Sequence, residues 1–70
     1  MKKISFYCSK KATDNLKKRI EEFPETCLRL VKIENHPKYN EVSEFTVKYY
    51  DPRILIFLGE EKKLAEMGIE

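Results

Sequence analysis

The sequence predicts one α/β domain, residues 1–70, built on a four-stranded mixed sheet. Three observations predict it. The chain opens with two segments in which polar and apolar residues alternate, and an amphipathic segment separates them. A run near residue 55 is apolar on both faces, and Gly59 offers a turn directly after that run. A chain of seventy residues buries only about 60% of the surface its unfolded form exposes, so we expect modest stability.

The first two elements follow from the period of the apolar residues. Residues 3–8 alternate polar and apolar side chains, with Cys8 on the apolar side, which predicts a strand covered on one face. Residues 13–23 repeat apolar side chains at intervals of four and three, which predicts an amphipathic helix. Pro24 is expected to end it.

The middle of the chain predicts three further elements. Residues 27–34 alternate and are rich in branched side chains, so we expect a second strand, joined to the first by a right-handed parallel crossover. Residues 37–47 suit a short helix. Residues 53–58 are apolar on both faces and predict a central strand with Leu55 buried in its middle.

The end of the chain has two interpretations. A hairpin at Gly59 would return residues 62–67 as a fourth strand, which gives a βαβ(α)ββ chain with strand order 2-1-3-4. A terminal helix over residues 60–67 is the alternative, because these residues are good helix formers.

Two stretches support a family resemblance. ISFYCSKKATDNLKKRIEEF resembles the opening strand and helix of a thioredoxin or glutaredoxin domain, and KIENHPKYNEVSEFTVKYYDPRILIFLGEEKKLAEMG resembles the second half. The family's CxxC would fall within residues 11–15, which hold no cysteine, and no residues remain for its C-terminal helix. The resemblance implies that Pro52 takes the place of the family's cis-proline and that a bare sheet face is covered by a partner or a second copy.

The missing cysteine pair favours a redox-inactive binding or regulatory module that acts through protein–protein interaction with a protein partner or as a homodimer. The expected binding surface combines the segment around Pro52 with the positive start of the first helix. Its residues are Lys10, Lys11, Tyr50, Asp51, Pro52 and Arg53.

The alternative is a thiol oxidoreductase of the glutaredoxin or thioredoxin type that uses Cys8 alone, so whether the chain is an enzyme stays open, with the non-enzymatic interpretation preferred. Cys8 ends the first strand, and two lysines and a helix N-terminus follow it, which would lower the pKa of its thiol. Strand parity instead places Cys8 among buried residues. Cys27 is expected at the opposite end of the sheet, so we expect no disulfide.

Charge and composition disfavour several other functions. The net charge is +2, and the cations gathered in residues 1–20 lack interleaved aromatic side chains, so we do not expect nucleic-acid binding. His36 is the sole histidine and has no ligand at metal spacing, so neither a metal nor a cofactor is expected. No apolar run approaches the roughly 20 residues that cross a membrane, and we expect a cytoplasmic protein.

Overall fold

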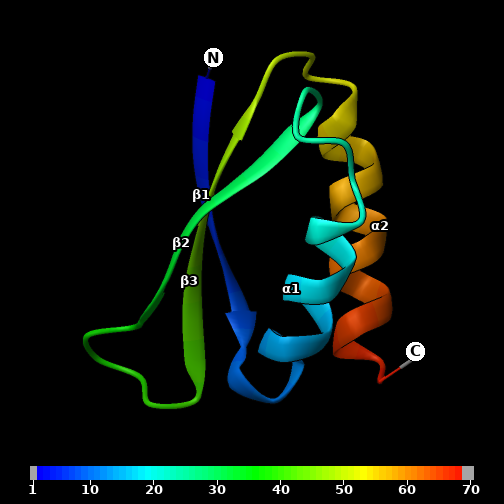
Figure 1. The fold of residues 1–70 in the computed structure, drawn as a ribbon. Helices are drawn as coiled ribbons and strands as arrows, with labels where there is room; N and C mark the ends of the chain where they lie inside the picture. Colours follow the sequence, from blue (N-terminus) through cyan, green and yellow to red (C-terminus); the bar gives the residue numbers. More distant parts are fainter. Residues whose placement is uncertain (1, 69–70) are drawn as a thin grey trace.

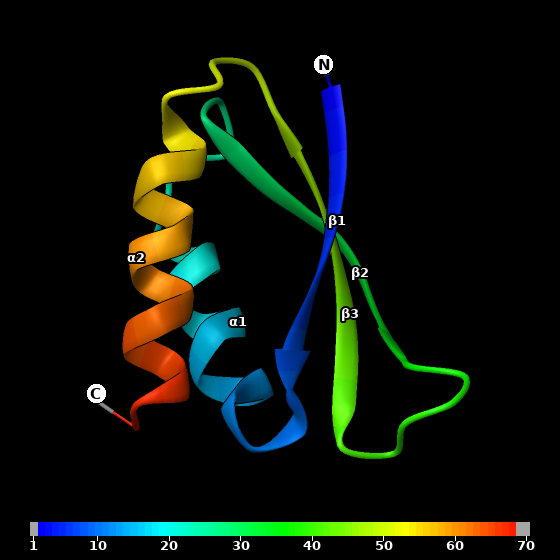
Figure 2. The same cartoon turned by 180° about the vertical axis from the view of Figure 1, so that it is seen from behind.

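The computed structural model describes residues 2–68, which form three antiparallel strands and two helices. The order along the chain is β1 (Lys2–Ser9), a short 3-10 turn η1 (Lys10–Ala12), α1 (Thr13–Glu21), β2 (Leu28–Asn35), β3 (Val42–Tyr49) and α2 (Ile54–Glu66). Both helices pack on one face of the sheet, and the other face is open (Figures 1 and 2).

The sheet has the order β1-β3-β2, and β3 pairs antiparallel with both of its neighbours. The expected four-stranded mixed sheet of order 2-1-3-4 is therefore wrong. The strands β1 and β2 do run in the same direction across the α1 crossover, but β3 lies between them, as in a split βαβ unit. Periodicity reports which face a strand buries and carries no information about which strand lies next to it.

Two segments take the opposite secondary structure from the one expected. Residues 42–49 form β3, where a short helix over residues 37–47 was expected, and the run beginning at Ile54 starts α2, where a central strand was expected. The terminal-helix alternative for residues 60–67 agrees with α2, and the fourth strand does not exist in the described chain. The sheet face beside α1 is thus covered by the chain itself and not left bare.

The start of α2 explains the error at Ile54. The carboxylate of Asp51 accepts the Arg53 N–H at 3.0 Å, and Pro52 follows it, an arrangement that suits the first turn of a helix. The backbone N–H of Ile54 then donates to the Asp51 carbonyl at 3.0 Å and opens the turn. Gly68, with φ of 78°, ends α2 in the left-handed conformation that glycine tolerates.

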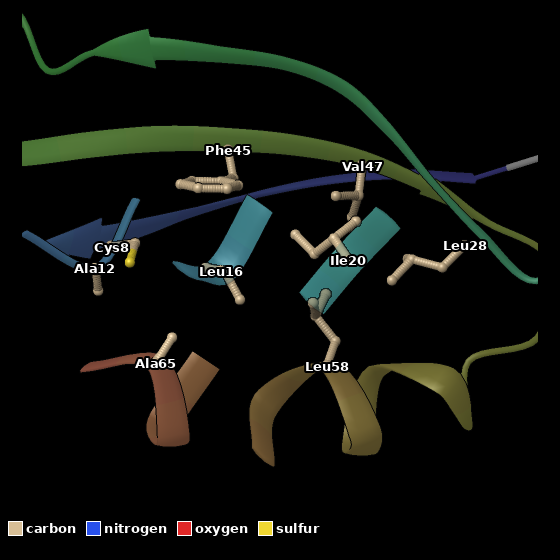
Figure 3. Close-up of a cluster of buried hydrophobic side chains, with 9 residues drawn as sticks. All are labelled: Cys8, Ala12, Leu16, Ile20, Leu28, Phe45, Val47, Leu58 and Ala65. Atoms are coloured by element: carbon tan, nitrogen blue, oxygen red, sulfur yellow. The ribbon is translucent and has the colours of Figure 1, made fainter. Parts of the chain in front are cut away.

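The core lies between the sheet and the two helices (Figure 3). Phe45 and Val47 of β3 point to it from the central strand, and Leu16 and Ile20 of α1, four residues apart, face them from one side of the helix. The remaining members are Cys8, Ala12, Leu28, Leu58 and Ala65. Phe6 stacks on Phe45 with ring centroids 5.5 Å apart, which extends the core toward the free edge of β1.

Candidate functional site

The expected binding residues separate into two groups at opposite ends of the molecule. Lys10 and Lys11 lie in η1, where β1 ends, whereas residues 50–53 connect β3 to α2 at the other end (Figure 1). Lys11 lines a polar groove of about 600 Å³ beside α1 and α2. The structure therefore does not bring these residues together as one surface.

The β3–α2 connection borders an apolar hollow of about 480 Å³. Three of the expected residues line it, together with residues of the α1–β2 loop and the first turn of α2. The lining consists of Thr26, Cys27, Tyr50, Asp51, Arg53, Ile54 and Phe57. Tyr50 is 60% exposed and Phe57 is 55% exposed, so two aromatic rings stand at an open cavity.

Asp51 and Arg53 form an ion pair at the rim of this hollow. The guanidinium Nη2 lies 2.5 Å from Oδ2 of Asp51, and Nε lies 2.9 Å from the same oxygen. Hydrogen bonding to the Arg53 side chain lowers the pKa of Asp51 below its usual value, and both groups are exposed to solvent. The peptide bond before Pro52 is trans, since none of the bonds between residues 2 and 68 is cis, which departs from the resemblance.

Cys8, the alternative catalytic residue, is buried at 2% exposure, as strand parity predicted. Desolvation by this burial raises the pKa of its thiol, and the nearby carboxylate of Glu66 adds to the effect. The lysine that lowers the pKa of Cys8 is Lys62 and not Lys10 or Lys11, which follow Cys8 in the sequence, and its effect is smaller than that of burial. Both cysteines are free, and Cys27 is exposed.

The open face of the sheet gathers residues that sequence analysis did not connect. Lys3 pairs with Lys48 across β1 and β3, and Lys48 pairs with Arg29 across β3 and β2, so three cations form one row. At the other end of the face, the rings of Tyr7 and His36 have centroids 5.1 Å apart. Strand register places Lys3, Lys48 and Arg29 together, and a correct assignment of β3 would have been needed to find this row.

His36 holds the aromatic end of this face in place. Its Nδ1 accepts the backbone N–H groups of Lys38 at 3.0 Å and Tyr39 at 3.3 Å, and its ring lies 5.0 Å from that of Tyr39. The histidine thus closes the β2–β3 loop, and Tyr39 stays 61% exposed. Among residues 2–68, no group of three or more His, Cys, Asp and Glu side chains has metal-binding geometry.

Comparisons with known proteins identify no relative of this chain. The chain matches no protein-family model, and neither the curated proteins nor the solved structures give a match. Within the described residues, neither helix has the length and apolar character needed to cross a membrane.

Proposed function

We propose that the protein is a protein-binding module without redox chemistry, and that the hollow between the α1–β2 loop and the start of α2 receives an apolar side chain of its partner. One observation carries this proposal. A hollow of about 480 Å³ lined by Tyr50, Ile54, Phe57 and Cys27 lies open to solvent in a chain of seventy residues. Apolar pockets with a few polar groups at the rim are the usual form of a binding site.

The exposure of neighbouring side chains supports this location. Ile56 lies next to Phe57 in the sequence of α2, and the two side chains are 66% and 55% exposed. Exposed apolar side chains that cluster typically mark an interaction surface, and aromatic residues are enriched among those that dominate binding energy. The Asp51–Arg53 pair at the rim offers charged groups to the backbone of an incoming segment.

The state of Cys8 supports a non-enzymatic function. A thiol reacts as its thiolate, and burial that raises the pKa of Cys8 disfavours the thiolate near neutral pH. The oxidoreductase alternative therefore lacks an activated nucleophile at this position. We place the module in the cytoplasm as part of the same proposal, because both cysteines are free and reducing compartments keep thiols in that state.

The hollow is tested by titrating the protein with N-acetylphenylalanine amide, which carries an aromatic side chain between two peptide groups, and recording amide chemical shifts. We expect saturable shifts at residues 26–27 and 50–57. Phe57→Ser should abolish them. Met67→Ser is the matched control, because Met67 is 63% exposed and lies at the C-terminal end of α2, about 15 Å from Phe57. Shifts that do not saturate, or that survive Phe57→Ser, would contradict the proposal.

Sedimentation equilibrium between micromolar and millimolar concentrations identifies whether a second copy is the partner. A dimer that Phe57→Glu dissociates and Met67→Glu leaves intact would assign the hollow to self-association. A monomer that still binds the amide in the titration would assign it to another protein.

A further inference from the structure

Three cations in one row distinguish the open face of the sheet. Lys3, Lys48 and Arg29 lie directly opposite one another on β1, β3 and β2, and none of them forms an ion pair with a carboxylate among residues 2–68. Lys32 lies in the next row, where it pairs with Glu34 at 2.6 Å. The face therefore carries three positive charges that the described chain does not neutralise by contact.

This row works against the stability of the free protein. Directly opposite side chains on one face of an antiparallel sheet have Cβ atoms about 5 Å apart, and like charges in such positions are destabilising. Lys48 is half-buried between its two cationic neighbours, so it has the least access to water of the three. A bound anion would relieve the repulsion.

One exposed aromatic ring shares this face with the cations, and a second lies next to it in the β2–β3 loop. Tyr7 is on the same side of β1 as Lys3 and lies four residues further along, which is about 14 Å in an extended strand. It is 53% exposed, and Tyr39, joined to it through His36, is 61% exposed. Neither tyrosine belongs to the core, so their rings are available to a ligand.

We propose that the open face binds single-stranded nucleic acid, with phosphates over the Lys3–Lys48–Arg29 row and bases stacked on Tyr7 and Tyr39. Cations that contact the backbone, combined with aromatic platforms for the bases, are the elements such binding requires. The lysines of α1, which sequence analysis considered for nucleic acid, lie on the other layer of the molecule (Figure 2). This site is separate from the hollow of the proposed function.

The acidic residues of the same face restrict where the phosphates of a bound strand can lie. Glu44 lies opposite both Tyr7 and Glu34, so carboxylates occupy the row at the aromatic end. They repel phosphates from that row and confine the backbone contacts to the cationic end. An acidic peptide would satisfy the cations but would not require stacking on the tyrosines, so the two ligands differ in their dependence on Tyr7.

Fluorescence anisotropy with 5′-labelled dT8 between 50 and 200 mM salt tests the proposal. Three phosphate contacts to a single strand predict a slope of log K against log salt concentration of about −2. Tyr7→Ser should weaken binding by about 5- to 150-fold through loss of one stacking platform. Lys48→Gln should weaken binding and make the slope less steep by about 0.7.

Two control variants test whether dT8 binding depends on the open face of the sheet. Lys17→Gln removes the same charge from the exposed side of α1, and Tyr50→Ser removes a tyrosine from the hollow; both should leave dT8 binding unchanged. Circular dichroism verifies that each variant is folded. The proposal is overturned if dT8 does not bind at millimolar protein concentration, or if Lys17→Gln weakens binding as much as Lys48→Gln. It is also overturned if Tyr7→Ser does not weaken binding, because the face would then bind anions without base stacking.

Discussion

Alanine substitutions along the apolar run 54–58 discriminate the helix α2 from the central strand that its composition suggests. Within the run 54–58 of α2, only Leu58 is fully buried, at 4% exposure, whereas Leu55 is half-buried and Ile56 is 66% exposed. A strand covered on both faces would bury all three side chains. The two structures therefore predict different patterns of destabilisation from the same three substitutions.

The magnitudes follow from burial. Leu58→Ala should lower the free energy of unfolding by about 2–5 kcal/mol, the range for a fully buried leucine. Leu55→Ala removes three half-buried carbon atoms at about 0.8 kcal/mol per fully buried methylene, which gives roughly 1 kcal/mol. Ile56→Ala should cost less than about 0.5 kcal/mol, because the side chain is exposed and alanine has the higher helix propensity.

Urea denaturation followed by circular dichroism at 222 nm measures these differences, provided that the m-value stays constant among the variants. A seventy-residue protein has about 4–10 kcal/mol of stability in total, so Leu58→Ala is expected near the limit of folding. Leu55→Ala and Ile56→Ala remain measurable in any case. A cost above about 2 kcal/mol for Ile56→Ala would refute the placement of α2.

Three further predictions concern Gly59, the thiol of Cys8 and the ion pair of Arg19 with Glu61. Gly59→Ala should raise stability by about 1 kcal/mol, because Gly59 is inside α2 with no atom within 4 Å of an added Cβ; thermal melting checks it, and a loss of stability would indicate a turn. Burial raises the pKa of the Cys8 thiol above that of the unfolded chain, so the contribution of Cys8 to stability is complete below about pH 8.5 and is lost as pH rises through the folded pKa. Urea denaturation of wild type and Cys8→Ala across this pH range measures the loss. Identical pH profiles for the two proteins would be inconsistent with the raised pKa. A double-mutant cycle on Arg19 and Glu61, which join α1 to α2 at 2.6 Å, should give a coupling energy below about 1 kcal/mol, and a value of zero would show that the pair does not persist in solution.

Local periodicity was sufficient for the elements whose apolar residues match one period. The strand β1, the helix α1 and the strand β2 were all predicted within a few residues of their bounds. Each buries one face only, with Cys8 in β1 and Leu16 in α1 as fully buried examples, so the sequence pattern and the burial pattern coincide.

Periodicity failed where the environment is mixed. In β3 the core-facing position 43 holds a serine, buried at 3% exposure, so the apolar alternation is limited to Phe45, Val47 and Tyr49. On the open face of the same strand, the polar residue Thr46 is buried to 8% exposure. Its hydroxyl is hydrogen-bonded to that of Ser5 at 3.0 Å, a contact that only the tertiary pairing creates. Without β3, neither the strand order nor the cationic row of the open face was predictable.

The misassigned run in α2 and the proposed binding surface have the same physical origin. One helix face needs few apolar residues to cover a small sheet, and Leu58 and Ala65 supply the fully buried contacts. The apolar side chains of Ile56 and Phe57 exceed that need and remain in water, which is why the segment resembles a strand buried on both sides. Folding alone does not require this excess, so its location beside the hollow favours a partner that buries it, and replacing both residues by polar ones should impair binding before it impairs folding.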